Sequence, residues 1–478
     1  MKRMGILDAS WLAVESAETP MHVGTLHVFS RPDGAPRDYL RTMFHRLRSE
    51  FELAEPWCNR LVYPSTLGRI AMPAWEKCAD VDLDYHVRHV ALPEPGSERE
   101  LGVLISRLHS RKLDFQRPLW EFYLIEGLEN NRFAFYCKMH HSMIDGISGV
   151  RLMQRVLADS PDERNMLPPW ALRQQRKRRR KPIATLPGTI TTSLSTLKLQ
   201  ANNIPHLASA WRRLSQASGQ HANQIAAPFN GPLSAMNGRI SSERRFATQR
   251  YEMDRIKAVA KAADASLNDV VLYLCSTALR EFLQDQHRLP LESLTAGIPV
   301  NIRPPNDQST GTAISFMIAT LATDESDPLR RLQRIRESTH RSKQHLSKLP
   351  KEAINAYTVM LMSPFIGQAL TGMGGRTKPA FNLAISNVPG PAEPLYFEGA
   401  RLEAMYPISL ISHGSALNIT CISYNGTLNF GITGCRQTLP SMQKVAVAMG
   451  NALDDLEALV LPGAKKTAKS AVKQASGS

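Results

Sequence analysis

The chain is poor in cysteine and in acidic residues for its length. Its six cysteines among 478 residues form no CxxC pair and no metal-like spacing, which indicates reduced, mostly buried thiols rather than a disulfide framework or a zinc site. Residues 1–18 do not form a secretory signal peptide, because Asp8 and Glu15 interrupt the apolar core that such a peptide needs. We therefore expect a cytoplasmic protein.

Four common catalytic motifs are absent from the sequence. There is no GxSxG, no HExxH, no GxxxxGK[ST] and no GxGxxG. These patterns serve a serine hydrolase elbow, a zinc protease helix, a phosphate-binding loop and a dinucleotide-binding turn. The four corresponding enzyme classes lose support, and nothing in the sequence requires a metal ion.

Residues 353–375 carry no charge and are numerous enough to span a bilayer. Asn355, Pro364, Gln368 and several glycines make this stretch a poor lipid-facing helix. It therefore predicts a buried helix followed by a turn. Its small and apolar residues are equally compatible with lining a long acyl or alcohol tunnel and with plain core packing.

Basic residues exceed acidic ones, 58 against 43, which gives a net charge of +15 and a pI near 9.6. The excess is concentrated in residues 173–181 and in the lysines of residues 465–473. Neither block has interleaved aromatic residues, which argues against nucleic acid as a partner. Such clusters suit an anionic membrane surface, and a solvated linker and tail is the alternative.

The chain is too long for one compact core and predicts two domains of about 200 residues each. Strands and helices alternate in residues 1–165 and again in residues 241–460, which indicates α/β layers in both halves. Residues 166–240 are basic and polar and predict a partly helical connection between the halves. Residues 461–478 form a basic, flexible tail. A site for a ligand is expected between the two halves.

Apolar spacing predicts individual strands and helices in both halves. They are a strand at 23–29, a helix at 101–112, a strand at 120–125 and a helix at 268–282. In the last third of the chain, alternating apolar residues flank Asn425-Gly426. This dipeptide between two such runs predicts a β-hairpin.

The run HHSMIDG at residues 140–146 stands where a strand gives way to a helix. The odd-numbered residues from Phe133 to Met139 are apolar, the period-2 pattern of a half-buried strand, and helical spacing begins after Gly146. A histidine at such a corner can face a cleft, and its ordinary pKa of about 6.5 lets it take and return a proton near neutral pH. One packed and one solvated ring is the alternative for an arbitrary histidine pair.

HHxxxDG after an alternating strand resembles the active-site motif of the coenzyme A-dependent acyltransferase superfamily. That superfamily includes chloramphenicol acetyltransferase, plant acyltransferases and the condensation domains of peptide synthetases. The resemblance implies an α/β fold, in α+β layers, of two chloramphenicol-acetyltransferase-like domains with the active site in a cleft or tunnel between them. It also places the catalytic base on the second histidine, His141.

Six ordered blocks narrow this resemblance. They are PMHVGTLHVF (20–29), DFQRPLWEFYLIEGL (114–128), HHSMIDGISG (140–149), SLNDVVLY (266–273), GIPVNIRP (297–304) and NLAISNVPGP (382–391). Together they look like the bacterial bifunctional wax ester synthase/diacylglycerol acyltransferase family, from near the N-terminus to about residue 460. One departure is Gly311-Thr312, where members commonly read Gly-Asn, which puts a polar role for residue 312 in doubt.

The resemblance assigns supporting roles around His141. Asn268 would donate a hydrogen bond to an oxyanion. Without the resemblance, the sequence favours Asn268-Asp269 as the N-cap region of the following helix. Arg303, otherwise a surface charge after a strand, would pair with Asp145 and make that carboxylate structural. His140, Gly146 and Asp269 would support the corner.

Two further blocks would bind substrate or shape the cleft. Pro118, Leu119 and Trp120 form the first, for which the alternative is a strand that begins there and buries a tryptophan. Ser386, Asn387 and Pro389 belong to the second, which is at least a turn. In the family, this second block would hold a loop that crosses between the domains.

The resemblance implies an O-acyltransferase that makes wax esters from long-chain fatty alcohols and triacylglycerol from diacylglycerol. His141 would act as general base, with no acyl-enzyme and no cofactor, because acyl-CoA is a substrate. We expect an enzyme attached peripherally to the inner face of the membrane or to lipid droplets. A condensation-type enzyme with a carrier-bound donor and a non-catalytic lipid- or CoA-binding protein are the alternatives.

Overall fold

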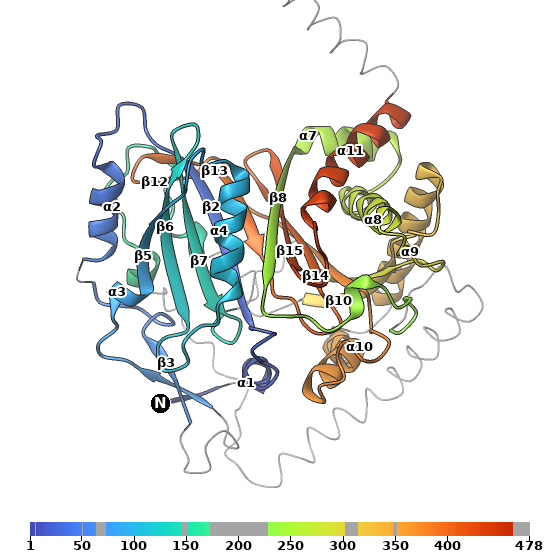
Figure 1. Ribbon diagram of the computed structural model, residues 1–478, viewed down its shortest axis with the longest axis horizontal. Helices are drawn as coiled ribbons and strands as arrows, with labels where there is room; N and C mark the ends of the chain where they lie inside the picture. Colours follow the sequence, from blue (N-terminus) through green and yellow to red (C-terminus); the bar gives the residue numbers. More distant parts are fainter. Residues whose placement is uncertain are drawn as a thin grey trace, which may run out of the picture.

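The computed structural model describes residues 1–4, 6–49, 51–63, 73–144, 149, 152–172, 228–301, 314–347 and 351–461. Across these residues, strands form two six-stranded sheets and one three-stranded sheet. The two large sheets lie side by side, and helices pack against both (Figure 1). This arrangement confirms the α/β layers expected from the sequence. The proposed domain limits stay a prediction, and most of the connection between them lies outside the described residues.

The N-terminal sheet has the order β12-β13-β2-β7-β6-β5 and is antiparallel except for the β5–β6 pair. Its strands are β2 (His22–Ser30), β5 (Val87–Ala91), β6 (Trp120–Leu128), β7 (Arg132–His140), β12 (Tyr396–Phe397) and β13 (Ala400–Ile408). Strands β12 and β13 come from late in the chain. Residues 396–408 therefore join the N-terminal sheet although they belong to the predicted C-terminal half.

The C-terminal sheet has the order β10-β9-β11-β14-β15-β8. Its strands are β8 (Arg244–Glu252), β9 (Thr295–Asn301), β10 (Ile314–Thr320), β11 (Leu383–Val388), β14 (Leu417–Tyr424) and β15 (Thr427–Cys435). The predicted hairpin is confirmed, because Tyr424 pairs with Thr427 across Asn425-Gly426. Both turn residues have positive φ, 41° and 73°, as a two-residue hairpin turn requires.

A small sheet at the N-terminus joins β1 (Lys2–Arg3), β4 (Ala74–Lys77) and β3 (Asn59–Val62). The helices are α1 (Ile6–Ala13), α2 (Tyr39–Leu47), α3 (Leu83–His86), α4 (Glu98–Ser110), α7 (Met253–Ala262), α8 (Leu267–Asp285), α9 (Pro328–Ser347), α10 (Lys351–Leu370) and α11 (Gln443–Val460). Helix α4 begins three residues before the predicted start, because Ser97 and Glu100 form a capping box around its first turn. Short 3-10 turns lie at Pro169–Ala171 and Ala235–Asn237.

Strand β7 is buried on both faces, so the prediction of a half-buried strand was wrong. Its odd-numbered side chains, Phe133 to Met139, join one apolar cluster with Trp120 and Trp170. Ala134 and Tyr136 face a second cluster that includes residues of α4. Because α4 covers this second face, the polar even-numbered side chains are buried as well.

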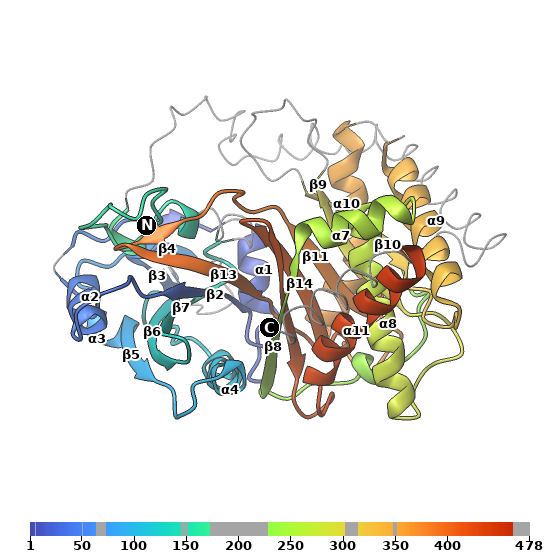
Figure 2. The same ribbon diagram turned by 90° about the horizontal axis from the view of Figure 1, so that it is seen from above.

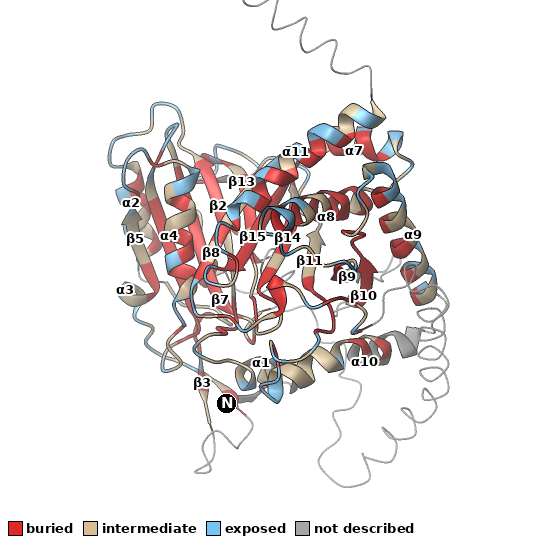
Figure 3. Cartoon of the chain, turned by 45° about the vertical axis from the view of Figure 1, so that its right-hand side comes forward, coloured by how far each residue is buried: buried red, intermediate tan, exposed pale blue. Residues whose placement is uncertain are grey.

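The uncharged stretch forms α10 and a turn, as predicted, but the helix is not buried. Tyr357 and Leu361 pack in an apolar cluster with Phe381, while Leu370 and Met373 are exposed. Much of the helix is only half-buried (Figure 3). Within the described part of the chain, no helix is long and apolar enough to cross a membrane.

The two halves meet at α4 and at β13. Helix α4 lies beside the edge strand β8 (Figure 2), where the backbone N–H groups of Arg244 and Phe246 donate to the hydroxyls of Ser110 and Ser106 at 2.9 Å each. Strand β15 also approaches β13 closely. A Cβ on Gly431 would lie 1.8 Å from the carbonyl oxygen of Pro407, so only glycine fits at this contact.

We expect Gly431→Ala to destabilise the folded protein by about 1–3 kcal/mol, because the added methyl forces the two sheets apart. Urea unfolding followed by circular dichroism measures this difference. Gly450→Ala in α11 is the control: its nearest neighbour would lie at an ordinary 3.8 Å, and alanine stabilises a helix by roughly 0.5–1 kcal/mol over glycine. Equal stability of Gly431→Ala and the wild type would contradict the close contact.

Candidate active site

The paired histidines stand at the end of β7, as the sequence predicts. The backbone N–H of His140 donates to the carbonyl of Leu119 (3.0 Å), and that of His141 donates to the carbonyl of Met21 (2.8 Å). Neighbouring strands thus fix the backbone of both residues. The side chains differ in burial: His140 is 1% exposed, whereas His141 is partly exposed.

The imidazole of His140 is held at both nitrogens. The backbone N–H of Ser142 donates to Nδ1 (3.1 Å), and the Ser142 hydroxyl lies 2.6 Å from the same atom. Because Nδ1 accepts from a backbone N–H, Nε2 carries a hydrogen, and it lies 2.7 Å from Oε2 of Glu15. Phe115 packs edge-on against this ring. His140 is therefore bound into the core.

Glu15 is a buried carboxylate with several donors. Its side chain is 2% exposed, and besides His140 it accepts from the N–H of Met21 (3.2 Å) and pairs with the ammonium of Lys112 (3.2 Å). Burial alone would raise the pKa of Glu15, but the hydrogen bond and charge of His140, with Lys112 and Met21, hold it below the ordinary 4.5. Glu15 is thus ionised at neutral pH.

The ring of His141 packs against Trp11 of α1. The ring centroids are 4.2 Å apart at 33°. Met21 connects the backbone of His141 to the carboxylate described above, since the N–H of Met21 donates to Glu15 and its carbonyl accepts from the backbone N–H of His141. Strand β8 reaches the same region, because Arg244 donates to the carbonyl of Glu18 (2.8 Å). The corner consequently lies where the two halves meet.

A buried polar layer lies behind the corner. His22, opposite His140 in the β2–β7 register, lies 2.9 Å from the carbonyl of His109. Lys138 is fully buried, and its ammonium pairs with Glu121 (2.7 Å). Burial lowers the pKa of Lys138, although Glu121 opposes this shift, and burial followed by nearby positive charges lowers the pKa of His22 and His109 well below 6.5.

Trp120 is the first residue of β6, and Pro118 and Leu119 directly precede this strand. Trp120 is fully buried, stacks on Trp170 and donates through its indole to the carbonyl of Trp57 (2.8 Å). Leu119 is also buried and accepts from the backbone of His140. The block therefore supports the histidine strand from behind through packing and one backbone bond.

Asn268 and Asp269 lie in the first turn of α8. Ser266 is the N-cap, and Asp269 closes a capping box with it, which fits the helix-cap interpretation. Asp269 is buried and also accepts from the Thr339 hydroxyl (2.6 Å). Asn268 is half-buried.

Ser386 and Asn387 are residues of strand β11, so the interpretation of this block as a turn was wrong; irregular chain follows the strand from Pro389. Pro389 is exposed. The chain then passes from the C-terminal sheet to β12 in the N-terminal sheet. Gly390 permits this crossing, because a Cβ there would lie 2.1 Å from the carbonyl oxygen of Ser423.

Several predicted features lie outside the described residues. They are Asp145, Gly146, Arg303, Gly311-Thr312, the basic block 173–181 and the tail lysines of 465–473. The pairing of Arg303 with Asp145 stays a prediction.

The sequence interpretation missed Trp11, Glu15, Lys112 and Ser142 as neighbours of the histidine pair. Glu15 carried a signal, since it is a lone carboxylate in the otherwise uncharged residues 9–17. A charge in such a segment calls for a buried partner. Nothing local identifies that partner as His140, which is 125 residues away.

Sequence comparison covers nearly the whole chain. Residues 4–271 match the wax ester synthase/diacylglycerol acyltransferase catalytic domain, and residues 310–457 match the WS/DGAT C-terminal domain. A Mycobacterium tuberculosis protein named as a diacylglycerol O-acyltransferase is 40% identical, over 96% of this chain and 97% of its own. The O-acyltransferase WSD of Acinetobacter baylyi is 37% identical, over 96% and 98%.

Solved structures give the same picture. The wax ester synthase/diacylglycerol acyltransferase of Marinobacter aquaeolei superimposes with a TM-score of 0.77 at 36% identity, over 96% of this chain and 100% of that chain. The first condensation domain of the calcium-dependent antibiotic synthetase reaches 0.56 at 16% identity, over 96% of each chain. The second likeness concerns the fold alone, and both agree with the α/β fold expected from the sequence.

We expect Glu15→Gln to destabilise the protein in a pH-dependent way. The folded-state pKa of Glu15 is depressed, so its charge stabilises the fold above the ordinary value of 4.5, and this contribution disappears as pH falls through the folded-state pKa. The variant should lose roughly 1–3 kcal/mol at pH 7, and less as the pH drops below 4.5. Urea unfolding across this range measures the difference.

The matched control is Glu292→Gln, at an exposed position, which should stay within about 0.5 kcal/mol of the wild type. A Glu15→Gln difference that does not change with pH would show that the carboxylate charge is irrelevant to the corner.

Proposed function

Because the chain belongs to the wax ester synthase/diacylglycerol acyltransferase family, we propose that His141 is the general base that transfers a long-chain acyl group from acyl-CoA to a lipid hydroxyl. The chain is an acyl-CoA-dependent O-acyltransferase. The proposal concerns which residue handles the proton, which acceptors are used and where the enzyme works.

The contrast between the two histidines carries this proposal. His140 is buried, and both of its ring nitrogens are hydrogen-bonded inside the protein. It has no room to meet a substrate hydroxyl. His141 is partly exposed at the end of the strand, and a general base must come within hydrogen-bond reach of the proton that it abstracts. Of the pair, His141 is the ring that a substrate can approach.

The reaction proceeds in one displacement without an acyl-enzyme. His141 accepts the hydroxyl proton of the alcohol while the oxygen attacks the thioester carbonyl. The tetrahedral oxyanion then collapses, the carbon–sulfur bond breaks, and the imidazolium returns the proton to the CoA thiolate. The proton taken from the alcohol thus ends on the CoA thiol. Written this way, the reaction needs neither a metal nor a cofactor. General-base assistance of this kind contributes about 10² to 10⁴-fold.

Two contacts position the base. Packing against Trp11 restricts the plane of the imidazole, and the Met21 carbonyl fixes the backbone. Such restraint raises the fraction of enzyme in which the ring is correctly oriented. Asn268 at the start of α8 remains our candidate for an oxyanion donor, a contact whose removal typically costs about 10²-fold or more.

Long-chain fatty alcohols and diacylglycerol are the acceptors that we propose, with long-chain acyl-CoA as donor. The names of the bacterial relatives support both acceptor types. A carrier-bound donor is the second candidate, supported only by the fold-level likeness to a condensation domain. A net charge of +15 supports attachment of the enzyme to an anionic membrane or a lipid droplet on the cytoplasmic side.

We expect His141→Ala to reduce the rate of CoA release from hexadecanoyl-CoA by about 10² to 10⁴-fold, with hexadecanol or a diacylglycerol as acceptor. A thiol-reactive dye measures the released CoA, and circular dichroism verifies the fold. The control is His45→Ala, which removes an exposed histidine of α2 and should leave the rate unchanged.

Substantial CoA release by a folded His141→Ala protein would exclude His141 as the base. In the wild type, release with either lipid acceptor and no added protein supports the proposed donor. Turnover that appears only with an acyl group on a carrier protein would favour the condensation-type alternative.

A further inference from the structure

Helix α10 and the turn after it expose apolar side chains on the C-terminal half. Leu370 is 56% exposed and Met373 is 41% exposed. One turn earlier, a Cβ on Gly367 would meet no atom within 4 Å, so this side of the helix faces open space. The opposite side packs inward on a cluster of apolar residues. Because residues 353–375 carry no charge, the exposed side of α10 is uncharged there.

Three polar side chains of α10 and its turn donate within the same segment. The exposed hydroxyls of Ser363 and Thr371 each donate to a carbonyl of the preceding helical turn at 2.7 Å. The amide nitrogen of Gln368 donates to the hydroxyl of Thr377 (2.9 Å) and to the carbonyl of Lys378 (2.7 Å). These donors do not depend on water, so they can face an apolar medium at little cost.

Three exposed cations stand next to this uncharged face. Arg376 and Lys378 follow the turn in sequence and are exposed. Arg239 is exposed as well, and its backbone meets the turn, since a Cβ on Gly375 would lie 2.7 Å from the Arg239 nitrogen. An apolar face beside cations suits an anionic lipid surface, because the lipid buries the apolar area while the cations meet the headgroups.

The face of α10 lies on the same side of the molecule as the catalytic corner. Helices α1 and α10 are both at the lower side in Figures 1 and 3, and Trp11 of α1 packs against the ring of His141. His413 stands between the two regions. A Cβ on Gly374 would lie 2.8 Å from its carbonyl oxygen, and Glu18, which follows α1, opposes the lowering of the pKa of His413 by burial.

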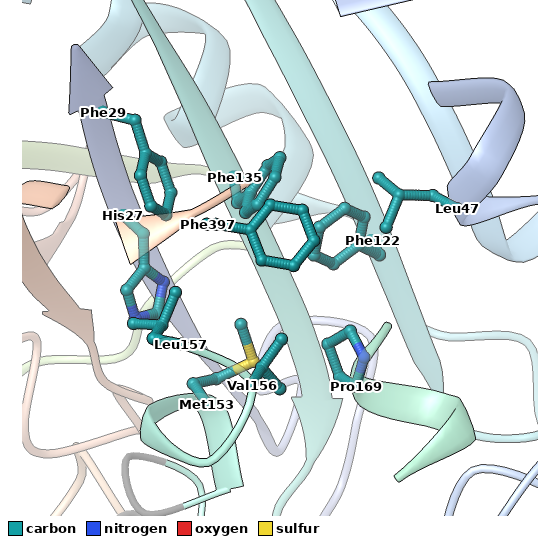
Figure 4. A pocket seen from close by; sticks show the side chains of 10 residues that line it. All are labelled: His27, Phe29, Leu47, Phe122, Phe135, Met153, Val156, Leu157, Pro169 and Phe397. Atoms are coloured by element: carbon teal, nitrogen blue, oxygen red, sulfur yellow. The ribbon is translucent and has the colours of Figure 1, made fainter. Parts of the chain in front are cut away.

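Two other apolar regions of the described chain differ from this face. Phe135 and Phe397 lie together over the N-terminal sheet (Figure 4) and are at most 3% exposed. Helix α11 exposes Val447 (61%) and Leu459 (50%), but it also exposes two aspartates between them, which an anionic surface repels. Helix α11 therefore serves as a control for α10.

We propose that the exposed side of α10, its turn and the cations Arg239, Arg376 and Lys378 form a docking surface for an anionic lipid bilayer. The exposed apolar side chains would enter the boundary between headgroups and acyl chains, and the cations would contact the lipid phosphates. This proposal rests on the proposed function, because long-chain alcohols and diacylglycerol dissolve in a bilayer. Docking through α10 would bring the bilayer to the side of the molecule that holds His141.

The first test removes the exposed apolar groups. Leu370→Gln/Met373→Gln should weaken binding to vesicles of phosphatidylglycerol and phosphatidylcholine by about tenfold in a flotation assay, because two side chains lose their transfer into lipid. Val447→Gln/Leu459→Gln, on α11 at the opposite side of the molecule (Figure 1), should bind like the wild type. Wild-type binding by the α10 variant, or an equal loss in the α11 variant, would overturn the docking surface.

The second test concerns the cations. Arg376→Gln/Lys378→Gln should weaken binding to the same vesicles by roughly fivefold for each cation and leave binding to pure phosphatidylcholine vesicles unchanged. Arg37→Gln/Arg41→Gln removes the same charge from exposed positions at α2 in the other half and should have a much smaller effect. Equal losses in both variants would show that net charge alone attracts the lipid, which would contradict the placement of these cations at the docking surface.

Activity separates docking from chemistry. Leu370→Gln/Met373→Gln should release CoA at the wild-type rate with hexadecanol dispersed in detergent, and about tenfold more slowly with diacylglycerol in vesicles below half-saturation. If the lipid-free wild type is a dimer that this variant dissociates, the face binds a second copy of the chain and the proposal is wrong. Failure of the wild type to release CoA would contradict the proposed function, whereas vesicle binding without acyl-CoA still tests the docking surface.

Discussion

The buried contact between Glu15 and His140 is the interaction on which the site depends. A carboxylate so far from water needs compensating donors, and here they come from three separate parts of the chain: His140, Lys112 and Met21. Met21 also restrains the second histidine, because its carbonyl accepts a hydrogen bond from the backbone N–H of His141. One buried charge thus ties the segment between α1 and β2 to the end of β7, next to the partly exposed His141.

Two strands from late in the chain join the N-terminal sheet and link the two halves. Strands β12 and β13 belong to the N-terminal sheet but follow β11 of the C-terminal sheet in the chain. Helix α4 fills the space between β7 and β8, and Gly431 lets β15 approach Pro407 closely. Since backbone groups meet directly at these points, neither half can shift without breaking contacts of the other.

The sequence predicts those parts of the structure that local patterns control. The β14–β15 hairpin, helix α8 and the strand before the histidines follow from periodicity and turn chemistry, which act over a few residues. Burial of Lys138 could not be predicted, because it depends on α4 and on Glu121 in the neighbouring strand. For the same reason Trp11 and Glu15 escaped notice, since they meet the histidines only after long-range folding. Family motifs supplied His141, which the structure places at the predicted strand end.

Burial distinguishes four other histidines of the N-terminal half from the histidine proposed as base. Burial lowers the pKa of His27 and His86 to about 4, and of His22 and His109 well below the ordinary value. Such buried rings stay neutral near pH 7, because the protonated imidazolium would be deprived of water in the protein interior. A base that must accept a proton and return it within one turnover therefore has to avoid full burial. His141, directly after β7, is partly exposed, and its backbone is fixed by the hydrogen bond to Met21.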